Sequence, residues 1–160
     1  MNSYQLNFDG AILARGFWLY IWEIAVKDGR TFHYVGKTGD KSSGRSQSPF
    51  DRLSKHLGHN KNNNALRRHI GNSKIDPEQC SFRFHACGPL FDSKPTETHG
   101  DLCDIASGLE KALADAMAEA GYTVINTVNC RKPLEEKRFT DLRAAFATQF
   151  PKLAVRKKHP

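Results

Sequence analysis

Several side chains in this sequence have types and spacings that could support proton transfer and bind a negatively charged substrate. Arg52 and His56 are four residues apart in a segment with helical periodicity, so they project side by side. Glu110 falls at the margin of the apolar stripe of another predicted helix. Tyr20 and Tyr34 lie 14 residues apart in two aromatic runs. An arginine can stabilise charge on a phosphate, tyrosine and histidine can transfer protons, and a glutamate can hold a divalent cation.

Each of these residues also has an ordinary structural interpretation. An aromatic hairpin is usually no more than core, and Arg52 taken alone is typical of a helix surface. A carboxylate beside an apolar stripe is costly to bury without a partner. Glu110 is therefore either a cation ligand or an edge glutamate whose head group stays in water.

The two tyrosines belong to a predicted antiparallel hairpin. Residues 17–26 and 31–36 are rich in aromatic and β-branched types, which fit a half-buried pleated surface. Asp28-Gly29 between two apolar runs is a strong hairpin signal. Gly36 removes a side chain where another group can approach closely. A third strand is predicted over 80–87, where Phe82, Phe84 and Ala86 alternate with Ser81, Arg83 and His85.

Helices are predicted both before and after the third strand along the chain. A short one over 49–58 places Phe50, Leu53 and Leu57 on one face, and a second over 62–71 has an asparagine cap and a glycine stop. The longest runs from Asp101, as N-cap, to Ala120, with Gly121 ending it. Its apolar stripe comprises Leu102, Ile105, Leu109, Leu113 and Ala116.

The remaining segments carry weaker signals. Residues 10–14 are expected to cap the sheet. The polar loop over 39–49 is either a phosphate contact or a loop with no role. The last helix is predicted over 133–150, followed by a basic tail that contains Arg156, Lys157 and Lys158.

Composition is that of one domain of an ordinary soluble protein with an excess of basic residues. The chain has 160 residues, 39% of them hydrophobic, and a formal net charge of +7. Lysine and arginine outnumber acidic residues over 30–80 and 130–160, whereas 81–129 is acidic, and such basic blocks are typical of polyanion binding. No apolar run approaches the roughly 18–20 residues that span a bilayer. We expect a cytoplasmic protein with no signal peptide and no membrane partner; the four cysteines form no zinc-binding pattern.

Taken together, these positions resemble the GIY-YIG nuclease superfamily. Tyr20 follows Trp18-Leu19 where that family has Gly-Ile, and Tyr34-Val35-Gly36 matches the second half of the motif with valine for isoleucine. The family follows its second tyrosine with a helix that bears an arginine, often with a histidine one turn later, which Arg52 and His56 match. The loop before Arg52 is longer than is usual. The resemblance covers residues 17–130.

The resemblance implies roles for further residues. The family places a metal-binding glutamate on the helix after the third strand, which Glu110 matches, and then an asparagine, for which Asn126 is the best match and Asn129 the second. By the same analogy Tyr20 is the general base and Tyr34 positions water or phosphate. Lys37 or His56 would assist by charge or proton relay. The implied cofactor is Mg²⁺ or Mn²⁺.

We therefore predict an α/β (α+β) fold with a small, mainly antiparallel three-stranded sheet flanked by helices. Residues 1–130 would form the catalytic domain, and 131–160 a helix and basic tail packed on it or extending from it. The predicted function is metal-dependent hydrolysis of phosphodiester bonds in DNA. One site cuts one strand, so a double-strand break would need a homodimer or sequential nicking. The alternatives are a nucleic-acid-binding module without catalysis and a small-molecule enzyme, for which no cofactor motif is present.

Overall fold

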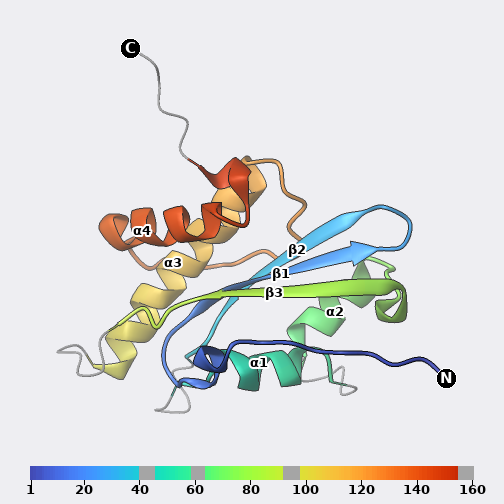
Figure 1. The fold of residues 1–160 in the computed structure, drawn as a ribbon. Coiled ribbons are helices and arrows are strands. Elements are labelled where there is room, and N and C mark those ends of the chain that lie inside the picture. The colour runs from blue at the N-terminus through green and yellow to red at the C-terminus, as the bar shows by residue number, and fades with distance from the viewer. Residues whose placement is uncertain (40–45, 59–63, 92–97, 155–160) are drawn as a thin grey trace.

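A three-stranded antiparallel sheet lies at the centre of the fold (Figure 1). The computed structural model describes residues 1–39, 46–58, 64–91 and 98–154. The strands are β1 (Leu19–Val26), β2 (Thr31–Lys37) and β3 (Cys80–Cys87), in the spatial order β2-β1-β3. The α+β fold and all three strands are thus confirmed, with ends within two residues of the predicted ones.

Register places the aromatic residues of all three strands on one face. Tyr20 pairs with Gly36 and Ala86, and Trp22 pairs with Tyr34 and Phe84. Residues directly opposite in an antiparallel pair point to the same face. One face of the sheet therefore carries an aromatic layer, while the other carries aliphatic side chains such as Leu19, Ile21 and Val35.

Helices cover both faces of the sheet (Figure 1). The helices α3 (His99–Glu119) and α4 (Glu136–Ala147) pack on the aliphatic face, and α1 (Pro49–His56) and α2 (Ala65–Asn72) cover the aromatic face. Two cores result, one on each side. Residues 131–154 belong to the aliphatic core, because Leu142, Phe146, Phe150 and Leu153 are all buried within it. This part of the C-terminal segment is packed on the sheet.

The short helices have caps of the predicted kind, although α2 begins at Ala65 and not at the predicted residue 62. Ser48 caps α1 in a reciprocal capping box with Asp51, and the Asn64 side chain accepts from the Arg67 backbone N–H to cap α2. The glycine stop of α2 was wrong. Gly71 lies inside the helix, and the left-handed residue after it is Lys74, with φ of 53°.

The two long helices start later or earlier than predicted. Asp101 is not the N-cap of α3: Thr98 caps the helix, and the Asp101 carboxylate completes the capping box by accepting from the Thr98 backbone N–H. Gly121 ends α3 with φ of 82°, as predicted. The helix α4 is shorter than the predicted 133–150, and Pro151 begins the separate turn η5 (Pro151–Leu153).

A short extended segment after α3 runs alongside β2. The His33 backbone N–H donates to Thr123 O at 2.7 Å, and the Ile125 N–H donates to His33 O at 2.8 Å, which forms a parallel bridge between His33 and Val124. This pairing holds Asn126 against the outer edge of β2. The sheet is thus mainly, though not wholly, antiparallel.

Other sequence-based expectations have mixed outcomes. Residues 10–14 do not cap the sheet: the turn η1 (Gly10–Leu13) has no buried residue and lies beside α1. Residues 40–45 of the polar loop and the tail residues Arg156, Lys157 and Lys158 lie outside the described residues. All four cysteines are free thiols. No helix in the described ranges has the length and apolar character to cross a membrane.

Candidate functional site

The candidate site lies on the aromatic face of the sheet, where β2 has a gap in its side chains. Gly36 is paired with Tyr20, and the Tyr20 ring lies across the Gly36 backbone. A Cβ placed on Gly36 would come within 2.5 Å of two ring carbons of Tyr20. Gly36 is therefore needed to seat the Tyr20 ring.

The helix α1 places Arg52 and His56 over the tyrosines. The Tyr20 hydroxyl and His56 Nε2 are 3.2 Å apart, within hydrogen-bonding distance. The His56 ring makes edge contacts with both tyrosines, with centroid distances of 5.4 Å to Tyr20 and 5.6 Å to Tyr34. His56 is only 5% exposed, less than the Phe50, Leu53 and Leu57 side chains that the sequence placed together on one face of this helix. The helix thus turns its polar pair toward the sheet.

The contact between Tyr20 and His56 offers a proton path. Arg52 lies close enough to Tyr20 to oppose the rise of its pKa, and because an arginine side chain only donates, it favours the phenolic oxygen as an acceptor. In the His56 tautomer protonated at Nδ1, the Tyr20 hydroxyl donates to His56 Nε2. Two buried atoms in this path, Arg52 Nε and His56 Nδ1, have no hydrogen-bond partner within the described part of the chain. Each is a donor available to a ligand or to water.

Burial shifts the protonation of all three rings away from charge. It raises the pKa of Tyr20 far above the usual 10, with Tyr34 and Glu110 adding to the effect and Arg52 opposing it. Burial, with Glu110 adding, raises the pKa of Tyr34 to about 12. The pKa of His56 falls to about 4 because of burial and the nearby Arg52 charge. At neutral pH both tyrosines are protonated and His56 is an uncharged acceptor.

Glu110 reaches the same site from α3 on the opposite layer. Burial raises its pKa from 4.5 to about 7, while Lys37 and Arg52 oppose the rise. Its charge in turn raises the pKa values of Tyr20 and Tyr34. The sequence placed this carboxylate at the margin of an apolar stripe, and it is half-buried, as expected there. Two cations and two tyrosines thus lie within electrostatic range of one carboxylate.

Lys37 and Asn126 are held by backbone atoms. Lys37 Nζ donates to Gly39 O at 2.7 Å. The Asn126 side chain accepts from the Val35 N–H at 3.0 Å and donates to Val35 O at 2.8 Å. Its amide thus makes the two hydrogen bonds that the backbone of a neighbouring strand would make. Since both ends of its amide are occupied, Asn126 fixes the strand that carries Tyr34 and Gly36. We therefore assign it a positioning role in the site.

Two contacts of the site were missed in the sequence. The Trp22 ring is stacked against His56 with centroids 6.5 Å apart, and the His69 ring of α2 lies 5.7 Å from that of Tyr34. Arg68, next to His69, is exposed and lowers the pKa of Tyr34. The spacing of Trp22 two residues after Tyr20 was a usable signal, because alternate strand residues share a face. Nothing in the sequence of α2 singled out Arg68 from Arg67.

The donors at this site suit a magnesium ion that is held mainly by water and substrate. Across the described ranges, no group of three or more histidine, cysteine or acidic side chains could enclose a metal. Mg²⁺ does not need such a cage, because it keeps several waters and often binds through one carboxylate and substrate phosphates. Glu110 is a half-buried oxygen donor with a raised pKa, so exchange of its proton for a cation would relieve the cost of its charge. Glu110 therefore fits the role of sole protein ligand.

In comparisons with known proteins, no protein-family model, no curated protein and no solved structure matches this chain.

Proposed function

We propose that this protein is a metal-dependent endonuclease of the GIY-YIG type that hydrolyses phosphodiester bonds in DNA. One observation carries the proposal: Tyr20, Arg52 and Glu110, from β1, α1 and α3, lie within electrostatic range of one another, and His56 lies 3.2 Å from the Tyr20 hydroxyl. A phosphodiesterase needs an activated water, positive charge at the phosphate and help for the leaving oxygen. This cluster has a group suited to each task.

Proton transfer runs through Tyr20 to His56. As water attacks phosphorus, it gives a proton to the Tyr20 oxygen while the Tyr20 hydroxyl proton moves to His56 Nε2. The tyrosine therefore never exists as a free phenolate, which its raised pKa would oppose. The negative charge of a bound phosphate would offset Arg52 and so raise the pKa of His56, making it a stronger acceptor when substrate is present.

Positive charge at the phosphate comes from Arg52 and Lys37. Arg52 lies close enough to Tyr20 to oppose the rise of its pKa, and its unpartnered Nε is a donor suited to a phosphate oxygen. Glu110 would hold Mg²⁺ or Mn²⁺, which would supply Lewis acidity at the phosphate and stabilise the leaving oxygen. Lys37 lowers the pKa of Glu110 and so favours the ionised carboxylate that a metal requires.

DNA is the proposed substrate because of the charge of the chain. The net charge is +7, and the excess of lysine and arginine over 30–80 falls in the segment that carries Lys37, Arg52 and Arg68. Phosphate contacts of this kind give sequence-independent affinity that weakens with salt. A single site cuts one strand.

A second candidate is a nucleic-acid-binding module that retains the fold without catalysis. The raised pKa of Tyr20 favours it, because a buried, protonated tyrosine is a poor base by itself. The replacement of Gly-Ile by Trp18-Leu19 before Tyr20 is also compatible with lost activity.

A plasmid assay separates the two candidates. The protein is incubated with supercoiled DNA in Mg²⁺ or Mn²⁺, with EDTA as the control for metal dependence. Glu110→Gln removes the proposed ligand with little change of shape, and Glu119→Gln removes an exposed carboxylate from the same helix. We expect nicking by wild type and Glu119→Gln and at least a 100-fold loss in Glu110→Gln, with DNA binding retained.

Two outcomes would contradict the proposal. Tight binding of DNA by a wild type that never cuts it, in either metal, would establish the binding module. Full cleavage by Glu110→Gln would show that the metal site is elsewhere or that none exists.

A further inference from the structure

Exposed apolar side chains gather at the N-terminus. Within the described residues, every large hydrophobic side chain that is exposed lies among the first 13 residues: Met1, Tyr4, Leu6, Phe8 and Leu13. Tyr4, Leu6 and Phe8 are 88%, 70% and 49% exposed and alternate with polar residues. Alternation with period two is the pattern of a strand with one buried face. We call residues 2–8 the arm.

The arm has the form of a strand without a partner. Its residues have no regular secondary structure, and their backbone groups make no hydrogen bond to the rest of the described chain. The arm is anchored only at its end, where Asp9 caps η1 and the Phe8 ring lies 5.0 Å from that of Phe50. An apolar stripe in such a segment marks an interaction site.

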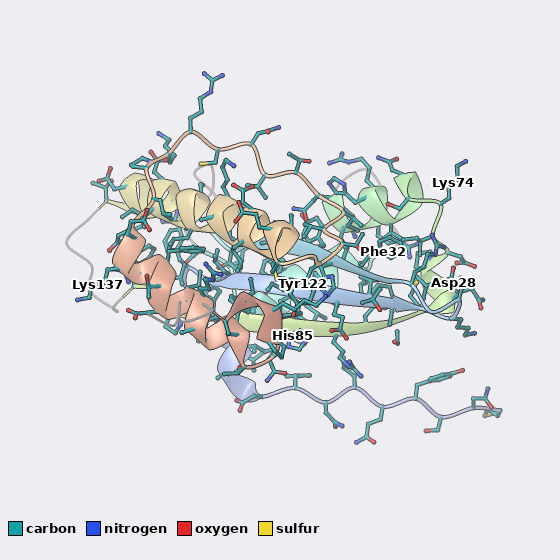
Figure 2. The ribbon with its side chains drawn as sticks, turned by 90° about the horizontal axis from the view of Figure 1, so that it is seen from above. Asp28, Phe32, Lys74, His85, Tyr122 and Lys137 are labelled. Atoms are coloured by element: carbon teal, nitrogen blue, oxygen red, sulfur yellow. The ribbon has the colours of Figure 1, made fainter. Side chains whose placement is uncertain are left out.

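The strand β3 has the complementary vacancy. It pairs with β1 on one side, and no other described strand pairs with its outer edge. A cavity of about 770 Å³ lies beside β3. It is lined by β3 residues Phe82–Cys87, by Leu6, Asn7 and Phe8 of the arm, and also by Leu53 of α1 and by Ala145 and Phe146 of α4. Figures 1 and 2 both show the arm running beside β3 and in the same direction. A slot with both apolar and polar side chains thus lies between the arm and the unpaired edge of β3.

The two edges have few of the features that normally prevent pairing with another chain. Exposed edges are commonly protected by charged side chains, proline or bulges. The arm has no proline and no charged side chain. Arg83 is the only charged residue in β3; its side chain is largely exposed and lines the cavity, but its charge is paired with Glu23 of β1 at 2.7 Å.

We propose that the arm of a second copy of this chain occupies the slot, so that two copies form a symmetric dimer through a continuous sheet. The strand order across the dimer would be β3, the partner's arm, the chain's own arm, and the partner's β3. A two-fold axis makes the two arms antiparallel. Because each arm runs in the same direction as its own β3, each partner arm is also antiparallel to the β3 that it joins. Every new strand pair is therefore antiparallel, once the arms move from the level of α1 into the plane of the sheet.

The size of the interface suits a stable dimer. Six arm residues span about 20 Å as a strand, which matches about six of the eight residues of β3. Burying the exposed parts of Tyr4, Leu6 and Phe8 on each of two copies removes roughly 800 Å² from water. The backbone and the covered surface of β3 add to this area and bring it toward the usual range of specific interfaces. Pairing of the arm with β3 of the same chain is less favourable, because the contacts of Asp9 and Phe8 hold the arm away from β3, with the slot between the two segments.

The test measures the mass of the full chain by sedimentation velocity from about 1 to 200 µM. Leu6→Asp places a charge in the proposed sheet. Leu13→Asp is the matched control, because it places the same charge at an exposed leucine outside that sheet. Wild type and Leu13→Asp should dimerise with the same dissociation constant. Leu6→Asp should raise that constant at least about 100-fold, since two buried leucines are lost per dimer. Circular dichroism should be unchanged, because Leu6 is exposed in the single chain.

Hydrogen exchange identifies the occupant of the slot. In the dimer, arm amides and outward-facing β3 amides should become protected together as concentration rises, and Leu6→Asp should lose that protection. If wild type stays monomeric at 200 µM, the proposal is wrong. That conclusion also holds if the arm amides are protected in the monomer, because the arm would then be paired within its own chain. A Leu6→Asp dimer as tight as wild type would place the interface elsewhere. Neither measurement depends on nuclease activity.

Discussion

Replacing Gly36 by alanine tests whether the Tyr20 ring is seated as the structure shows. In a strand, Gly→Ala normally stabilises by about 0.5–1 kcal/mol, because glycine loses more backbone entropy on folding. Here the added methyl would lie within 2.5 Å of two ring carbons of Tyr20, a side chain that is 1% exposed. Overpacking of this kind costs about 1–3 kcal/mol. The overlap outweighs the entropy gain, so Gly36→Ala should destabilise the fold by about 0.5–2 kcal/mol.

A double-mutant cycle assigns that cost to the ring. In Tyr20→Leu the ring carbons are gone, so Gly36→Ala should become neutral or stabilising in that background. Tyr20→Phe keeps the ring and should give no such relief. The free energy of unfolding is measured in urea for the singles and doubles, and the coupling between Gly36→Ala and Tyr20→Leu should be about 1–3 kcal/mol.

The matched control for this cycle is Gly71→Ala. Gly71 lies in α2 with ordinary backbone geometry, and no atom lies within 4 Å of an added Cβ. It should therefore stabilise by up to about 1 kcal/mol. If Gly36→Ala is as stable as wild type, or costs the same with and without the Tyr20 ring, the packing of Tyr20 on Gly36 is wrong.

Three further predictions concern the site. Because the pKa of Glu110 is raised, its contribution to stability is fully present below pH 4.5 and is lost as the pH rises through about 7. In urea titrations, the stability of wild type relative to Glu110→Gln should fall on the order of 1–3 kcal/mol between pH 4.5 and 8. A difference that does not change with pH would contradict this. The lowered pKa of His56 predicts that NMR will show a neutral ring down to about pH 4, and that a bound DNA dinucleotide will raise this pKa. The contribution of the neutral ring to stability is present above pH 6.5 and is lost as the pH falls from 6.5 to about 4. Protonation near pH 6.5 in the free protein would refute the buried position. Asn126→Ala leaves both Val35 backbone groups without a partner and should lower the free energy of unfolding in denaturant by about 1–3 kcal/mol. Replacing the exposed Asn129 by alanine should change that free energy by no more than about 0.5 kcal/mol. Equal effects of the two substitutions would remove the positioning role of Asn126.

The strands could be predicted because their signals are local. Asp28-Gly29 between two aromatic runs fixes a hairpin, and the alternation over 80–87 fixes the third strand and its aromatic face. The i, i+4 spacing of Arg52 and His56 likewise places them on one side of α1. These features depend on residues only a few positions apart, which is the range over which sequence patterns are informative.

The sequence did not show which side of α1 faces the sheet. Its apolar residues favour burial of Phe50, Leu53 and Leu57, yet His56 is the more deeply buried side chain. The reason is tertiary: a layer formed by Tyr20, Trp22 and Tyr34 surrounds the His56 ring with aromatic edges and faces. Asn126 is a similar case, because only its position beside β2 shows that its amide is occupied by Val35.

The pKa values at the site restrict how Tyr20 can act as a base. Even an unperturbed tyrosine, with a pKa of 10, lies about six units above His56 at about 4, so moving its proton to His56 costs about 8 kcal/mol. Burial of Tyr20 increases that cost. A rate of about 1 s⁻¹ corresponds to a total barrier of about 17 kcal/mol, so a separate deprotonation step would use half of it before phosphorus is attacked. The proposed catalysis through Tyr20 would therefore require that the two proton transfers accompany the attack of water, or that substrate charge first brings the two pKa values closer together.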